Sequence, residues 1–192
     1  MPGRGIEALR VLVALLIAAV ACTAGGDQRD QVVKGIIVTS PAFRDSTPIP
    51  GRHSCDGEDL SPRLAWIDLP AGTRNLAVIC DDPDAPGGRW VHWVLYNIPP
   101  DAPGLSEGLP ASETLKDGSR QGLNDFGRIG YGGPCPPRRS THRYFFRVYA
   151  LDQGLVLGPR ATGKTLERAM EGHVLGSGTL MVTFRRTDNA DH

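Results

Sequence analysis

The sequence predicts a mainly β fold, a largely antiparallel β-sandwich with one or two peripheral helices. Its 192 residues include 24 glycines and 16 prolines, an excess that is typical of a chain with many turns. Short β-branched and aromatic runs alternate with these turn-rich stretches, and a helical pattern is convincing in one place only. The apolar share of 40% and the charged share of 22% are those of an ordinary globular domain.

The expected strands follow one another along the chain. Their interiors are nearly continuously apolar, as expected for strands that are buried between layers. They cover residues 35–39, 64–67, 76–80, 90–98, 142–151 and 179–185.

The convincing helix covers 164–175, with Thr162 as its N-cap and Gly176 at its end. Leu166, Met170 and Val174 recur every four residues and would form its apolar side. A second, short surface helix is compatible with 111–115. The remaining long stretch, 99–139, reads as an ordered loop, and ordered loops of this length are usually functional.

The N-terminus reads as a signal peptide over residues 1–21. A short basic start precedes an uninterrupted apolar run of 11 residues, which would span about 16 Å as a helix, against about 30 Å for a bilayer core. The run ends in Ala19-Val20-Ala21, an A-x-A cleavage site. A buried N-terminal helix is the alternative to an export signal.

Cys22 leaves two outcomes open after export. Cleavage after Ala21 would release a soluble protein, whereas the sequence AVAC also resembles a bacterial lipobox, in which Cys22 is acylated and anchors the chain to a membrane. Residues 22–34 would then form a flexible tether, 35–187 the domain and 188–192 a tail. We therefore expect an exported protein, either periplasmic or a membrane-anchored lipoprotein of the cell envelope.

The remaining cysteines predict one disulfide. Cys55 and Cys135 both lie in Gly/Pro-rich loops and are the natural pair in an oxidising compartment. Cys80 ends an apolar run and reads as a buried thiol. Because no CxxC motif occurs, we expect no structural zinc.

The charge balance argues against a nucleic-acid partner. The chain has 21 Lys+Arg and 21 Asp+Glu, whereas a nucleic-acid binder needs a surplus of cations to displace counterions from phosphates.

A rigid acidic turn follows the apolar run that ends at Cys80. Asp81, Asp82 and Asp84 lie within four positions, and prolines at 83 and 86 restrict the backbone. Such a turn is either a solvated acidic turn or a device that holds a carboxylate toward a ligand or a histidine.

Two further segments carry polar groups that suit a small pocket. His92 lies in the run WVHWVLYNI, and strand alternation puts His142 and Tyr144 on one face of THRYFFRVYAL. Together with Asp82 they would bind a phosphate-like or carboxylate anion, helped by free amides near Gly133. Metal binding by the two histidines and an aspartate is the competing interpretation, but no HExxH or similar local pairing supports it, so no metal and no cofactor are predicted.

These segments resemble the phosphatidylethanolamine-binding protein family, most closely its bacterial Raf-kinase-inhibitor-like branch. The resemblance is carried by DDPDAP, by the WxHW strand and by GYGGPCPPRRSTHRYFFRVYAL. The segments SPAF, CDGEDLSPRLAW and GTLMVTFRR fit as well. The resemblance covers residues 35–186, nearly the whole expected domain.

The resemblance implies a Greek-key β-fold of two antiparallel sheets with a small anion pocket at one end. It also implies the ligand-binding residues, with Asp56 near them. These are Asp82, His92, His142 and Tyr144 in the pocket, Gly133 and Pro134 at its rim, and Ala85, Pro86 and Trp90 as its apolar wall.

The expected function is binding of a small anion or a phospholipid head group by an exported protein that is not an enzyme. No poised nucleophile is evident unless Cys135 is reduced. Two alternatives remain open. One is an inhibitor or interaction partner of an envelope protease or other protein, and the other is a phosphoester hydrolase that uses His92 and Asp82 as an acid/base pair. An export signal argues against a cytoplasmic kinase as partner.

Overall fold

The computed structural model describes residues 34–187. The predicted signal peptide, the lipidation site Cys22, nearly all of the tether and the tail lie outside the described residues.

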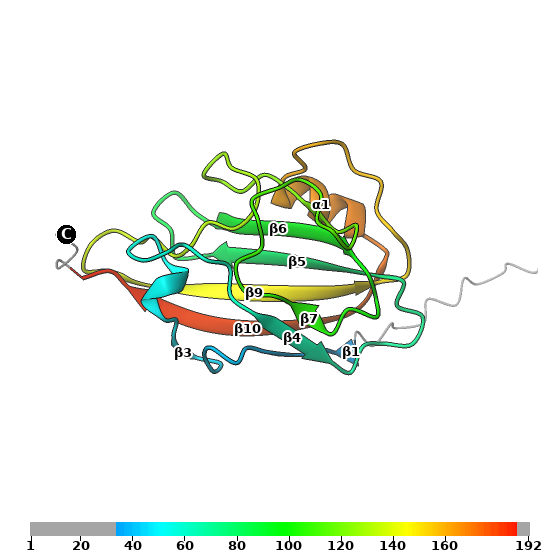
Figure 1. The fold of residues 1–192 in the computed structure, drawn as a ribbon, viewed down its shortest axis with the longest axis horizontal. Helices are drawn as coiled ribbons and strands as arrows, with labels where there is room; N and C mark the ends of the chain where they lie inside the picture. The colour runs from blue at the N-terminus through cyan, green and yellow to red at the C-terminus, as the bar shows by residue number, and fades with distance from the viewer. Residues whose placement is uncertain (1–33, 188–192) are drawn as a thin grey trace, which may run out of the picture. The chain divides into compact units, whose positions relative to one another are not determined.

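Four long antiparallel strands form the centre of the larger sheet, in the order β10-β9-β5-β6 (Figure 1). Shorter strands extend it, because β1 and β3 pair in parallel with β10, and β8 pairs with β6. The strands are β1 (Lys34–Gly35), β3 (Thr47–Pro48), β5 (Asn75–Asp82), β6 (Trp90–Ile98), β8 (Arg120–Gln121), β9 (Thr141–Leu151) and β10 (Val174–Arg185).

A second sheet of three strands covers one face of the first. It has the order β2-β4-β7 and is antiparallel throughout, with β2 (Ile37–Thr39), β4 (Leu64–Ile67) and β7 (Gly104–Leu105). Leu64 and Trp66 of β4 join Trp93, Phe146 and other large apolar side chains in the main core. The expected mainly β fold of two sheets is confirmed.

One α-helix covers the other face. Helix α1 (Gly163–Met170) begins at Thr162, whose hydroxyl accepts the Thr165 amide, and it buries Leu166 and Met170 against Ile79 and other residues of the larger sheet. The predicted N-cap is confirmed, but the predicted end at 175 is wrong. The chain turns at Gly172, which has a positive φ of 79°. It then enters β10 at Val174, because the backbone of that residue pairs with β9.

The second helix is not where the sequence suggested. Residues 111–115 form no helix, because Thr114 bridges to Arg120 and the Ser112 carbonyl accepts the side-chain amide of Gln121 at 2.9 Å. A single turn of 3-10 helix, η1 (Gly51–His53), occurs instead. No helix among residues 34–187 is long and apolar enough to cross a membrane.

Cys55 and Cys135 form a disulfide with a Cα–Cα distance of 5.4 Å, which is the pair expected from the sequence. It joins the segment after η1 to the loop before β9. Cys80 is a buried free cysteine in β5, and burial raises the pKa of its thiol well above the ordinary value.

Candidate functional site

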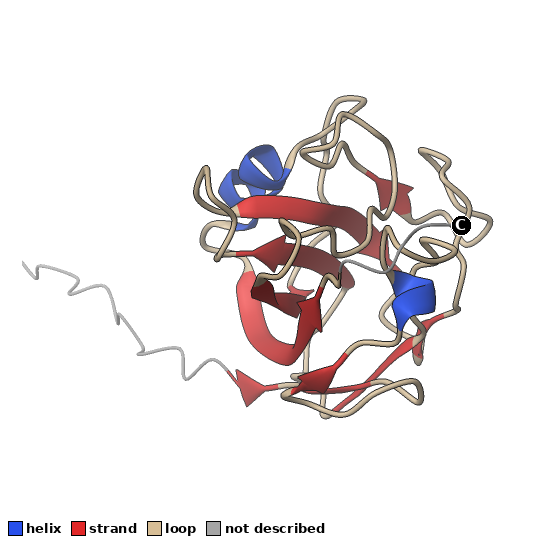
Figure 2. Cartoon of the chain, turned by 90° about the vertical axis from the view of Figure 1, so that its left-hand side faces the viewer, coloured by secondary structure: helices blue, strands red, loops and turns tan. Residues whose placement is uncertain are grey.

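Four strand termini lie at the same end of the larger sheet. β5 ends at Asp82 where β6 begins at Trp90, and β9 begins beside the end of β10, because neighbouring strands run in opposite directions. Figure 2 looks onto this end of the domain. Side chains that are far apart in the sequence can therefore converge here.

A cleft of about 380 Å³ opens at these strand ends. Six of the residues predicted for the site line it, namely Asp82, Ala85, Pro86, Trp90, His92 and His142. The other lining residues, none of which belongs to the predicted ligand-binding set, are Gly87, Phe126, Cys135, Pro136, Pro137 and Arg186.

Asp82 and His142 form a buried pair in the floor of the cleft. Their side chains are 4% and 8% exposed, and Nδ1 of His142 lies 2.8 Å from Oδ2 of Asp82. A carboxylate only accepts hydrogen bonds, so His142 Nδ1 carries the proton. The other carboxylate oxygen accepts the Asp84 amide at 2.8 Å. No described residue forms a hydrogen bond with His142 Nε2, which leaves this atom for a ligand.

The other two carboxylates of the acidic turn are held elsewhere. Asp81, which is 1% exposed, accepts hydrogen bonds from Arg89 at 2.9 Å and from Arg147 at 2.8 Å. Asp84 forms a two-pronged pair with Arg143, with N–O distances of 2.9 and 2.7 Å. The hydrogen bonds from Arg143 lower the pKa of Asp84 to about 2. The turn is therefore not simply solvated, because each carboxylate has its own partner.

His92 is also held at one ring nitrogen. Its Nδ1 lies 2.6 Å from the Gly132 carbonyl oxygen, which only accepts, so Nδ1 carries the proton. Burial lowers the pKa of His92 below the ordinary 6.5. The neutral ring then presents an unprotonated Nε2.

Tyr144 lies behind the cleft and does not line it. It is fully buried on the same face of β9 as His142, and its ring packs edge-on against His92 at 5.1 Å. Its hydroxyl is buried without a hydrogen-bond partner among the described residues. Burial and the negative charge of Asp82 raise its pKa far above the ordinary value. The structure thus makes Tyr144 a support for the His92 ring.

Gly133 and Pro134 are buried beneath the cleft and do not form its rim. The Gly133 amide donates to Oδ1 of Asp59 at 2.6 Å, so it is not available to an anion. The Pro134 carbonyl accepts the Cys55 amide at 3.1 Å. The next three residues of the loop, 135–137, line the cleft instead.

Arg186 brings the cleft a cation that is not among the predicted site residues. It directly follows β10, and its Nε donates to Oδ1 of Asp56 at 2.9 Å. Asp56 thus lies near the site, as the resemblance implied, but acts by holding this arginine. The signal was the pair of arginines that ends GTLMVTFRR, which strand periodicity alone cannot assign to a site.

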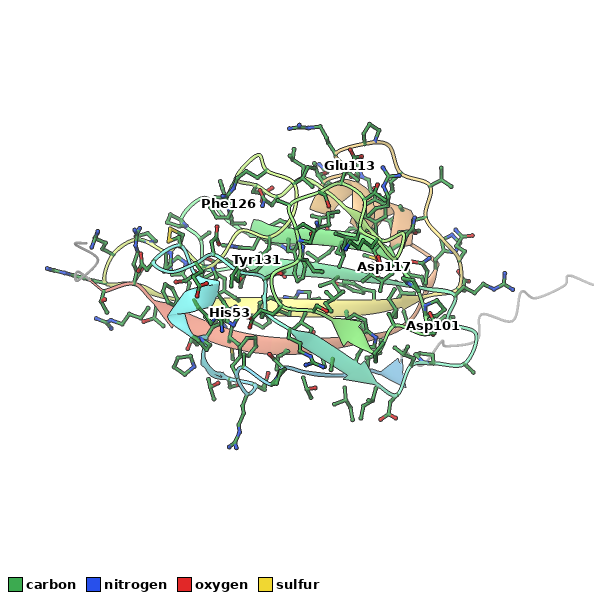
Figure 3. All side chains as sticks on the ribbon, in the orientation of Figure 1. His53, Asp101, Glu113, Asp117, Phe126 and Tyr131 are labelled. Carbon is green, nitrogen blue, oxygen red and sulfur yellow. A yellow bond between two sulfur atoms is a disulfide. The ribbon has the colours of Figure 1, made fainter. Side chains whose placement is uncertain are left out.

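The mouth of the cleft is aromatic. Trp90 and Phe126 pack edge-to-face with ring centroids 5.4 Å apart, and each is 37% exposed. Figure 3 labels Phe126 and also Tyr131, whose hydroxyl donates to the His53 carbonyl at 2.8 Å. Phe126 comes from the Gly-rich part of the long loop, where no periodicity indicates which side chains face inward.

The described residues contain no group of three or more His, Cys, Asp or Glu side chains that could hold a metal ion. Within the cleft, the Asp82 carboxylate is already engaged by His142 and by the Asp84 amide.

Comparison with known proteins identifies the fold and the relatives. A family model described as phosphatidylethanolamine-binding protein matches residues 39–185. A protein named UPF0098 protein from Methanothermobacter thermautotrophicus is 54% identical over 145 residues, which cover 76% of this chain and 95% of the relative. Another from Aquifex aeolicus is 45% identical over 151 residues, covering 78% and 88%.

Two crystal structures share the fold. CT736 from Chlamydia trachomatis, described as a phosphatidylethanolamine-binding protein homolog, has a TM-score of 0.72 and 39% identity, covering 79% of this chain and 98% of CT736. YbcL from E. coli, described as a member of the mammalian PEBP family, has a TM-score of 0.74 and 31% identity, covering 79% and 99%.

Proposed function

Because this chain belongs to the phosphatidylethanolamine-binding protein family, we propose that its cleft binds a small anion, either free or as a phospholipid head group. Binding takes place outside the cytoplasm and involves no catalytic step. The observation that carries the proposal is the buried Asp82–His142 pair. Nε2 of His142 has no hydrogen-bond partner among the described residues, and the His142 side chain lies in the cleft floor.

The pair suits an anion on electrostatic grounds. Asp82 accepts the hydrogen bond from Nδ1 of His142, so Nε2 is the ring atom that is left to interact with an anion. The Nε of Arg186 is bonded to Asp56, and the two terminal nitrogens of its guanidinium group supply further donors. His92 adds a donor when its Nε2 takes up a proton.

The apolar side of the cleft favours a ligand with an organic part. Trp90, Phe126 and the prolines at 86, 136 and 137 leave room beyond the polar floor. Pockets of this kind bind most of a ligand through apolar contact and orient it through a few polar groups. A phosphate ester such as a lipid head group uses both sides of the cleft.

The chemistry of the lining residues supports binding without turnover. No serine, threonine or lysine is among the residues that line the cleft, and Cys135 is held in the disulfide. Asp82 pairs with His142 and not with His92, so the acid/base pair considered from the sequence is not the one that the fold assembles.

The location outside the cytoplasm rests on the N-terminal sequence and fits the disulfide. Disulfides persist in oxidising compartments. If Cys22 is acylated, the anchor would hold the domain close to phospholipid head groups, which would raise the local concentration of that ligand.

Calorimetry on the full-length protein, extracted in detergent, tests the proposal. Phosphate, phosphoethanolamine and acetate are titrated into the wild type, His142→Ala and the matched control His173→Ala. His173 bonds to Asp152 on the surface, at 3.0 Å. We expect binding to the wild type and the control, and none to His142→Ala. Absence of binding to the wild type contradicts the proposal, and turnover of phosphoesters that depends on His142 would favour the hydrolase instead.

A further inference from the structure

The long loop contains a second feature, which the anion cleft does not use. Its strand β7 is an edge of the three-stranded sheet, with β4 on one side. Among the described residues no strand pairs with its other side. Edge strands expose unpaired backbone groups, and proteins usually shield them.

The register shows which backbone groups of β7 are unpaired. Leu64 pairs with Leu105, and Ala65 pairs with Gly104. The Trp66 amide donates to the Pro103 carbonyl. The hydrogen-bonded pairs of this antiparallel ladder are therefore Trp66 with Pro103 and Leu64 with Leu105. Bonded and non-bonded pairs alternate, so the N–H and C=O groups of Gly104 point away from β4.

Glycine is required at this position. A Cβ on residue 104 would collide with the carbonyl of Leu64. The residue that carries the outward backbone groups therefore cannot bear a side chain while it pairs with β4.

Two hollows flank this edge. One, of about 360 Å³, is lined by Leu109, Pro110, Leu115 and Lys116 among others. The other, of about 200 Å³, is lined by β4 and Arg63. Both include Gly104, Leu105 and Ser106, so they adjoin along β7. This geometry fits a strand whose side chains enter hollows beside a paired backbone.

The two adjoining hollows form one groove along β7, and its walls are ordered before any ligand binds. Ser61, which is 2% exposed, accepts the Gly108 amide at its carbonyl and the Leu109 amide at its hydroxyl, both at 2.9 Å. On the other side, the Trp66 indole donates to the Ala102 carbonyl at 2.8 Å. A ligand would therefore meet an ordered groove, which lowers the entropic cost of binding.

The charges at the groove favour acidic side chains. Arg63 and Lys116 are exposed, and neither forms an ion pair with another described residue. The carboxylate of Asp117, which also lines the groove and is labelled in Figure 3, accepts the Ser119 amide at 3.0 Å. Arg63 therefore lines one hollow and Lys116 the other, and among the lining residues Asp117 supplies the only carboxylate beside these two cations.

We propose that β7 accepts an extended polypeptide segment as a fourth strand of the smaller sheet, with backbone hydrogen bonds to Gly104. Apolar side chains of the segment fill the hollows, and acidic side chains lie beside Arg63 and Lys116. This interaction surface is separate from the anion cleft and does not depend on its ligand.

The test uses the full-length protein and a fluorescent, terminally blocked hexapeptide in which valine and glutamate alternate. Two further peptides have the same sequence but carry N-methylated amides on alternate residues. One lacks the backbone N–H donors along one edge of the strand, and the other lacks those along the opposite edge. We expect the parent peptide to bind by fluorescence anisotropy. One of the methylated peptides should bind at least about tenfold more weakly, since it lacks the strand hydrogen bonds.

Protein variants locate the site. Ser106→Trp fills the groove, and Lys116→Glu reverses one of its charges, whereas Lys164→Glu makes the same change on α1. The first two should weaken peptide binding about tenfold, while Lys164→Glu and the cleft variant His142→Ala should not. Absence of binding, or equal binding by all three peptides, overturns the proposal. So does sedimentation showing that β7 instead pairs two copies of this chain, in a dimer that Ser106→Trp dissociates.

Discussion

Asp82 and His142 are 60 positions apart in the chain, yet Oδ2 of the first lies 2.8 Å from Nδ1 of the second. Their strands, β5 and β9, are antiparallel neighbours, so the end of one lies beside the start of the other. Burial of both side chains strengthens their electrostatic interaction and makes the loss of either partner costly.

Replacing Asp82 by asparagine should weaken anion binding about tenfold, because an amide cannot balance an imidazolium at His142. The free energy of unfolding should fall by about 1–3 kcal/mol, the usual cost of a disrupted buried hydrogen bond. Calorimetry and urea denaturation measure the two effects. Asp84→Asn is the control, since its carboxylate pairs with Arg143 outside the cleft floor, and equal loss of binding in both variants would contradict the assignment.

Anion affinity should rise as the pH falls from about 7 to about 5, by up to about tenfold per pH unit. Burial lowers the pKa of His92, so the ring is neutral near pH 7, and a bound anion favours its protonated form. Titrations of phosphate at several pH values measure the slope. His92→Gln should flatten the part of the slope that comes from this ring. If the variant keeps the full slope, His92 is not the group that takes up the proton.

The disulfide should contribute about 2–4 kcal/mol to the free energy of unfolding, since it links residues that are 80 positions apart. Replacing both Cys55 and Cys135 by alanine removes this contribution, which denaturation curves with and without a reductant measure. The reductant should lower the stability of the wild type to that of the variant and leave the variant unchanged. An unchanged wild type under full reduction would contradict this role.

The Asp84 carboxyl should titrate near pH 2, because Arg143 donates two hydrogen bonds to it. Arg143→Gln should return its pKa toward the ordinary 3.8. Since the folded-state pKa is the lower one, the stability from this pair is present above about pH 4 and is lost as the pH falls toward about 2. Carbon-13 NMR of the side-chain carboxyl follows the titration directly. Identical curves for the wild type and the variant would exclude the pair in solution.

The strand segments were predictable because their residue types and their burial agree. Residues 90–98 read as a strand and form β6 with the same bounds. The helix end was not predictable, because Val174 continues the apolar spacing of α1 but is taken by the ladder with Leu151. Three of the two-residue strands, β3, β7 and β8, carry no periodicity at all, so only the neighbours with which they pair identify them.

The residue types of the site were visible in the sequence, and most of them line the cleft. The loop residues were harder to place. Gly133 was expected to offer its amide to a ligand, but Asp59 takes that amide. Phe126 and Arg186 line the cleft without any local pattern that distinguishes them from surface residues.

The sequence by itself determined the mainly β architecture, the pair of cysteines and the set of polar residues from which a site could be built. These follow from local properties, namely apolar patterning, turn chemistry and side-chain donors and acceptors. Only the tertiary structure decided how the partners are arranged: Asp82 with His142, Asp81 with two arginines, Asp84 with Arg143, and Tyr144 behind His92. Hydrogen bonds depend on distances of about 3 Å, and between residues tens of positions apart the folded backbone alone sets those distances.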